Sequence, residues 1–106
     1  MISMYAFVNL AMSSGQLRLT SADPNAKPHL DSRFFEDEFD RLRMREAILT
    51  CGGLGEHEAY AHIIEERLHP TNDELVSDDA LDPFMCRTVS TSLAPARWAQ
   101  IQPQLR

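Results

Sequence analysis

The chain has 106 residues, of which 43% are hydrophobic and 25% are charged, with four glycines and six prolines. These values fit one small soluble domain and exclude two domains, a collagen-like chain and a disordered acidic tail. The formal net charge of −6 disfavours a polyanionic partner such as DNA or RNA. The charge is uneven, because residues 93–106 contain two arginines and no acid and so carry +2, whereas residues 1–92 carry −8.

The N-terminal stretch has no basic region and no cleavage-site pattern, which is typical of mature protein rather than a signal peptide. No apolar run approaches the roughly 18 residues that a membrane-spanning helix needs. The two cysteines, Cys51 and Cys86, form no C-x-x-C pair and suit a reducing compartment. We therefore expect a cytoplasmic protein without a disulfide and without membrane contact.

The first part of the chain alternates as β-strands do. In residues 3–12, every second residue from Met4 to Met12 is apolar, which is the pattern of a strand with one buried side. After a turn signal at residues 13–15, residues 16–21 alternate again. We expect these two segments to pair as a β-hairpin. Residues 22–28 are then expected to form a loop, and residues 29–31 a short extended piece.

The rest of the chain shows helical patterns. We expect one helix over residues 37–51, with acids in its first turn and Gly52-Gly53 at its end. A shorter helix is expected over residues 56–66. Ser77, followed by two acids, is an N-cap signature for a third helix, which contains Pro83 and tends to kink there. The sequence therefore predicts an α+β fold, with an antiparallel hairpin packed by two or three helices.

The four histidines do not suggest a metal site. His57 and His62 are five residues apart, whereas metal-binding pairs on a helix usually sit four apart. His29 and His69 lie beside loop prolines and have no obvious partner in the sequence. We interpret all four as surface residues.

Other candidate residues also have simpler explanations. Asp78-Asp79 could be metal ligands, but acids at the start of a helix are more common. Residues 65–67 (Glu-Glu-Arg) are typical of a solvated face. Residues 52–55 (Gly-Gly-Leu-Gly) resemble a phosphate loop only superficially, because they follow a helix and no Lys-Ser/Thr or G-x-G-x-x-G pattern is present. Cys51 and Cys86 could act as nucleophiles only with a paired base, and the sequence places none.

One segment carries more information. Ser14 to Pro28 reads S-G-Q-L-R-L-T-S-A-D-P-N-A-K-P and resembles a hairpin and loop in the C-terminal, substrate-binding portion of the glucose–methanol–choline (GMC) oxidoreductases. Three later features follow in the order of that family, and the resemblance covers residues 4–92. They are an aromatic pair (Phe34-Phe35), an acidic helix start (Asp37 to Arg43), and S-D-D-A-L (Ser77 to Leu81) opening a helix that carries Arg87.

The resemblance implies where a catalytic base should follow. In GMC enzymes, a Thr/Ser-rich strand leads to a catalytic histidine and then to G-T-C-K-M-G. That histidine takes the proton of the substrate hydroxyl while the flavin takes the hydride. Residues 87–92 match this approach, but no histidine follows Ser92. We therefore assign no catalytic, cofactor-binding or metal-binding residue to this chain.

A shifted reading frame would explain the tail. Residues 93–99 can be encoded by CTG GCA CCT GCA AGA TGG GCC, and the same DNA read from the third base gives G-T-C-K-M-G. The amino acids determine most of the first two codon bases, so this agreement argues against chance. We hypothesise a frameshift near Ser92 that removed the histidine. Residues 1–92 would then be a partial GMC C-terminal domain, and residues 93–106 a non-homologous tail.

The resemblance implies FAD in the parent enzyme. The family's flavin fingerprint, a G-x-G-x-x-G after a first strand, has no counterpart in this sequence, so we expect no cofactor bound by this chain alone. We predict a fragment of the substrate-binding domain of a flavin-dependent alcohol oxidoreductase, inactive by itself. The alternative is a standalone interaction module that folds by oligomerising. The predicted partner is a separately encoded FAD-binding half or a second copy of the chain.

Overall fold

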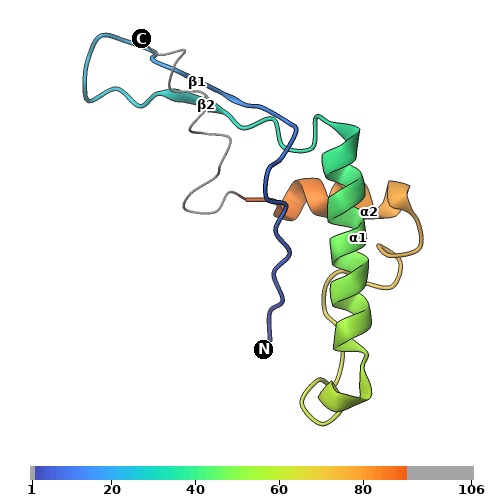
Figure 1. The fold of residues 1–106 in the computed structure, drawn as a ribbon. Helices are drawn as coiled ribbons and strands as arrows, with labels where there is room; N and C mark the ends of the chain where they lie inside the picture. Colours follow the sequence, from blue (N-terminus) through green and yellow to red (C-terminus); the bar gives the residue numbers. More distant parts are fainter. Residues whose placement is uncertain (1, 91–106) are drawn as a thin grey trace.

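The computed structural model describes residues 2–90 (Figure 1). Within this range two antiparallel strands and two helices confirm the predicted α+β class. The proposed tail, residues 93–106, lies outside the described residues. The elements in chain order are β1 (Gln16–Arg18), β2 (His29–Asp31), α1 (Glu38–Gly55), a single 3₁₀ turn η1 (Glu58–Tyr60) and α2 (Asp78–Thr88).

The hairpin joins different segments from those predicted. β1 pairs antiparallel with β2, with Leu17 opposite Leu30, whereas residues 3–12 form no strand. The long loop between the strands contains a turn that its own side chain stabilises. In this turn the Asn25 backbone N–H donates to Asp23 Oδ1 at 2.9 Å. A close approach at Gly15 also requires glycine, because a Cβ there would lie 2.2 Å from the Asp31 carbonyl oxygen. The expected strand pairing of residues 3–12 with residues 16–21 is therefore wrong.

Residues 9–13 are held by α1 instead of by a neighbouring strand. The buried Asp40 accepts the backbone N–H groups of Met12 at 2.9 Å and Ser13 at 2.7 Å. One turn further along α1, Arg43 donates to the carbonyl oxygens of Asn9 at 2.8 Å and Leu10 at 3.3 Å. These side chains satisfy backbone groups that a strand would otherwise pair in a ladder.

Helix α1 begins as predicted and ends later. Asp37 is its N-cap and accepts the Phe39 amide at 2.8 Å, while the Asp37 amide donates to Ser13 Oγ at 2.9 Å. The predicted end at Gly52-Gly53 is wrong, because both glycines lie inside the helix, which continues to Gly55. No described glycine has the positive φ of a glycine cap, and the last turn closes through the Glu56 amide and the Gly52 carbonyl at 3.2 Å.

The helix expected over residues 56–66 is reduced to η1. The Nδ1 of His57 caps this turn by accepting the Ala59 amide at 3.1 Å. The apolar stripe that suggested a longer helix finds little to pack against among the described residues, and Ile63 stays 52% exposed. A short amphipathic helix without a partner surface gains little from burial, so the chain turns back toward α2.

Helix α2 matches its sequence signature. Ser77 caps it by accepting the Ala80 amide at 3.2 Å, and Pro83 lies within it. In Figure 1, α2 crosses α1, and the core lies at this crossing. It consists of buried Phe35, Leu81 and Met85, with partly buried hydrophobic neighbours from both helices and the segments beside them, including Met44, Ile48, Leu75, Phe84 and Val89. None of the described helices is both long and apolar enough to span a membrane.

Candidate functional site

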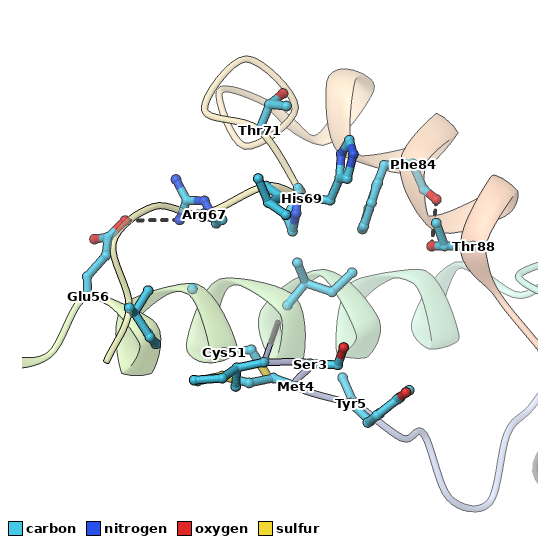
Figure 2. Close-up of a pocket in the computed structure, with 18 of the residues that line it drawn as sticks. Ser3, Met4, Tyr5, Cys51, Glu56, Arg67, His69, Thr71, Phe84 and Thr88 are labelled. Atoms are coloured by element: carbon cyan, nitrogen blue, oxygen red, sulfur yellow. Dashed lines mark hydrogen bonds and ion pairs between the residues drawn. The ribbon is translucent and has the colours of Figure 1, made fainter. Parts of the chain in front are cut away.

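An open groove of about 1440 Å³ runs along the crossing of the two helices (Figure 2). Its lining comes from the N-terminal segment, from α1, from α2, and from residues 56–77, the connection between the two helices. Tyr5 and Met4 lie on one side, and Phe84 and Thr88 on the other, with α1, which carries Cys51, between them. The groove is thus an apolar channel with polar groups along the helix connection.

Arg67 is a polar residue of the groove whose side chain bonds to two other residues. Its guanidinium donates to Glu56 Oε1 at 2.9 Å and to the side-chain oxygen of Asn72. The Arg67 Nε–H group is buried and has no hydrogen-bond partner in residues 2–90. The ion pair and the amide contact fasten the far end of α1 to the connection, so Arg67 acts here as a structural tie.

Glu74 forms a second polar centre beside the groove. It accepts the Thr71 backbone N–H at 2.7 Å and an N–H of Arg87 at 2.8 Å. These bonds, the Thr71 amide first, hold the pKa of Glu74 below its ordinary value. His69 Nδ1 lies 3.9 Å from the same carboxylate. The cluster therefore ties α2 to the connection.

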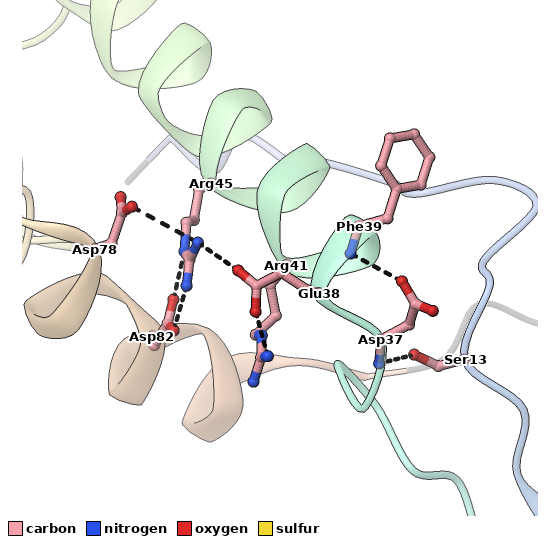
Figure 3. Close-up of polar contacts among 8 residues, drawn as sticks. All are labelled: Ser13, Asp37, Glu38, Phe39, Arg41, Arg45, Asp78 and Asp82. Atoms are coloured by element: carbon pink, nitrogen blue, oxygen red, sulfur yellow. Dashed lines mark hydrogen bonds and ion pairs between the residues drawn. The ribbon is translucent and has the colours of Figure 1, made fainter.

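Arg45 joins the two helices outside the groove (Figure 3). It donates two hydrogen bonds to Asp82, from Nε at 2.7 Å and from Nη2 at 2.6 Å, and one to Glu38 at 3.1 Å. Asp78 lies 3.6 Å from its Nη1. The hydrogen bond to Asp82, together with the carboxylates around it, raises the pKa of Arg45, and the same bond lowers the pKa of Asp82. This charge cluster fixes how α1 and α2 cross.

The structure places the four histidines at exposed positions. His29 lies in β2, His57 caps η1, His62 lies in the following turn and His69 precedes Pro70, and all four are exposed. Within residues 2–90 no group of three or more His, Cys, Asp or Glu side chains could hold a metal ion. Their interpretation as surface residues agrees with this exposure.

The other candidate residues from the sequence occupy positions that have structural explanations. Asp78-Asp79 lie in the first turn of α2, where Asp78 faces Arg45. Residues 52–55 form the last turn of α1, whose free backbone groups are carbonyls, so they do not make a phosphate-binding loop. Cys51 is half-buried in the groove and Cys86 is exposed on α2, both as free thiols. In the described part of the chain, neither thiol makes a hydrogen bond to a base.

Sequence reasoning missed the residues that organise the site, above all Asp40, Arg45 and Arg67. For Arg45 a signal was present, because Arg41 and Arg45 are one turn apart on α1, as are Asp78 and Asp82 on α2. Two such pairs of opposite charge on consecutive helices favour a contact between them. Asp40 bonds to residues 27 and 28 positions away, and Arg67 bonds to Glu56, 11 positions away, so these roles left no local pattern.

Comparison with known proteins identifies the family of the chain. A sequence model of the GMC oxidoreductase family matches residues 11–96, most of the chain. The chain therefore belongs to the GMC oxidoreductase family, as the hairpin-and-loop motif indicated. The match continues past Ser92, so the boundary placed there remains a prediction. No solved structure matches the chain.

The relatives are much longer proteins. The chain is 28% identical to pyranose dehydrogenase 3 of Leucoagaricus meleagris over 99% of its own length, which is 19% of that protein. It is also 27% identical to the oxygen-dependent choline dehydrogenase of Photobacterium profundum, over 83% of the chain and 15% of the relative. The chain thus spans between 15% and 19% of the length of these relatives.

The described residues do not fit the flavin dinucleotide that the family implies. A dinucleotide pyrophosphate needs a glycine-rich turn from a strand into the start of a helix, where free N–H groups point at the phosphates. The glycine cluster of this chain lies at the opposite end of a helix. The starts of α1 and α2 are each capped by a side-chain oxygen and carry acids in their first turns, which repel phosphate.

Proposed function

We propose that this chain is part of the substrate-binding portion of a flavin-dependent alcohol oxidoreductase, which converts C–OH to a carbonyl, and that it has no turnover by itself. The observation that carries the proposal is the GMC family match over residues 11–96 in a chain that spans about a fifth of its relatives. Residues 2–90 do not fit a flavin dinucleotide, which supports the proposal that the chain has no turnover by itself. Two reduced, free cysteines fit the cytoplasm as its compartment.

An apolar face of α1 that stays about half exposed among the described residues supports the view that other polypeptide packs against it. Phe39, Leu42 and Leu49 share one side of the helix and are 49–54% exposed. The opposite side carries Met44 and Ile48, which pack against α2. A helix with apolar residues on two opposite sides is typical of the interior of a larger protein.

The frameshift hypothesis also gains a second codon argument. If the Ser90 codon ends in C, that base and the obligatory AC of Thr91 spell CAC, a histidine codon. Two codons would separate this histidine from the G-T-C-K-M-G read in the same frame. The histidine and the motif would then appear in the order that the family resemblance implies, and the shift would lie before Thr91 rather than near Ser92.

Two measurements test the proposal. The first is the gene sequence across codons 89–99, which must give His and G-T-C-K-M-G in the neighbouring frame; other codons there would refute the frameshift. The second is flavin binding: the purified chain is mixed with FAD, separated by gel filtration, and scanned at about 450 nm, the absorbance band of the cofactor. We expect no flavin with the protein peak, and stoichiometric flavin would refute the proposed inactive state.

A further inference from the structure

Within residues 2–90, the side of β2 that faces away from β1 pairs with no other strand. In Figure 1 the hairpin extends away from the two helices, and the sheet has two strands within the described residues. No backbone hydrogen bond other than the ladder with β1 is found at His29–Asp31 in residues 2–90. A two-stranded hairpin is marginal in water, and an open edge is a template for a further strand.

The edge of β2 is complementary to itself. When two β2 strands run antiparallel with Leu30 at the centre, His29 of each copy lies opposite the partner's Asp31. The two-fold symmetry forms this contact twice. The pKa of Asp31 is lowered by its hydrogen bond with Arg33, which keeps the carboxylate ionised to accept an imidazole N–H. Side chains that attract each other directly across two strands stabilise the pairing of those strands.

The edge of β1 lacks this property. Antiparallel pairing of two β1 strands about Leu17 would place Arg18 opposite the partner's Gln16. In that arrangement Arg18 would meet an uncharged amide, whereas pairing at β2 lets an ionised carboxylate accept an imidazole N–H, a charge-assisted hydrogen bond. This hydrogen bond favours β2 over β1 as the contact edge.

The apolar face of the hairpin points to the same arrangement. Leu17 and Leu30 are opposite each other in the register and therefore lie on one face of the sheet. Leu30 is 47% exposed, so this face is open to a partner. Joining two hairpins at β2 would put both Leu30 side chains between the two Leu17 side chains, in one continuous apolar row.

We propose that two copies of this chain associate through their β2 edges into a four-stranded antiparallel sheet with its two-fold axis at Leu30. Four strands with one apolar face exceed the minimum that a sheet needs to be independently stable. The contact lies on the hairpin, apart from the groove, and does not depend on the proposed oxidoreductase origin of the chain.

Sedimentation equilibrium over a range of protein concentrations tests the proposal with a charge series at positions 29 and 31. The wild-type chain is expected to show a monomer–dimer equilibrium. His29→Asp places the new carboxylate opposite the partner's Asp31, and the two-fold symmetry repeats this repulsive contact. The dissociation constant of the dimer is expected to rise about tenfold or more. The double variant His29→Asp/Asp31→Lys restores an opposite-charge pair and is expected to recover the dimer.

The series controls for folding. Within one chain Arg18 lies opposite residue 29, so His29→Asp adds an attractive pair inside the hairpin and does not weaken it. The backbone amide shifts of Leu17 and Leu30 in NMR spectra report whether the hairpin persists. A wild-type chain that stays monomeric would overturn the proposal and assign the edge to another polypeptide. So would a dimer that His29→Asp leaves intact, or one that the double variant does not recover.

Discussion

Arg45 and Asp82 join α1 to α2 through a two-bond fork, from Nε to Oδ1 at 2.7 Å and from Nη2 to Oδ2 at 2.6 Å. A planar guanidinium facing a carboxylate in this way fixes both distance and orientation. The fork lies beside a core of only three buried apolar side chains among the described residues, so the helix crossing relies on it more than a larger domain would.

The fork predicts the effect of removing one charge. Asp82→Asn keeps the size of the side chain but loses the charge and one acceptor, so the melting temperature should fall by a few degrees. Asp79→Asn, an exposed neighbour in the same turn, is the matched control and should have a smaller effect. Thermal unfolding followed by circular dichroism measures both, and equal shifts for the two variants would show that the fork contributes nothing special.

Asp40 predicts loss of stability in acid. Burial opposes its ionisation, but the amides of Met12 and Ser13, with Arg43 nearby, outweigh burial and hold its pKa below the ordinary value of 3.8. The unfolded chain therefore binds a proton first as the pH falls, so this contribution is complete above about pH 4 and is lost below it. Asp82 shifts in the same direction.

Urea unfolding at pH 7 and pH 3 measures this contribution. The free energy of unfolding should drop at pH 3, and Asp40→Asn should drop less because it has no proton to gain at that position. Glu46→Gln, an exposed residue of the same helix, should keep the wild-type pH dependence. A wild-type pH dependence in Asp40→Asn would exclude Asp40 as a source of the acid effect.

Two glycines predict opposite outcomes for the same substitution. Gly15→Ala would place a Cβ 2.2 Å from the Asp31 carbonyl oxygen, so the hairpin must open and the amides of Leu17 and Leu30 should exchange faster with solvent. Gly53→Ala meets no atom within 4 Å inside α1 and should stabilise the chain by about 0.5–1 kcal/mol. Hydrogen exchange and urea unfolding distinguish the two, and a tolerated Gly15→Ala would argue against the β1–β2 pairing.

The small core predicts unusual sensitivity at Met85. Met85→Ala removes one of two fully buried side chains of the described region and should cost about 2–5 kcal/mol, enough to unfold much of the chain at room temperature. Cys86→Ala changes an exposed neighbour on the same helix and should be nearly neutral. If both variants retain the wild-type circular dichroism spectrum and urea midpoint, the core does not lie where α2 crosses α1.

Features with a local cause could be predicted from the sequence. The Ser77 cap, the α+β class and the start of both helices depend on neighbouring residues and were found correctly, whereas Asp37, expected within the first turn, is the N-cap of α1. The strand pairing was not, because residues 3–12 alternate like a strand while their backbone groups bond to Asp40 and Arg43 on α1. Alternation reports which side chains are apolar, and it does not report which groups accept the backbone hydrogen bonds.

The end of α1 shows a similar limit. A Gly-Gly pair ends a helix only where a residue adopts a positive φ, and here both glycines keep helical angles. A Cβ at Gly52 would lie 3.4 Å from Arg67 Nη1, an ordinary van der Waals contact, and a Cβ at Gly53 would meet no atom within 4 Å. Neither glycine is therefore required by a cap or by close packing in the described residues.

The anchoring of residues 9–13 by Asp40 and Arg43 has a consequence for synthesis. These residues leave the ribosome before α1, and their partners lie 27–34 positions later in the chain. At about 5–20 residues per second, the interval is on the order of a few seconds. During that time the backbone groups of residues 9–13 lack the side-chain partners that they have in the structure, so this segment reaches its folded conformation only after α1 emerges.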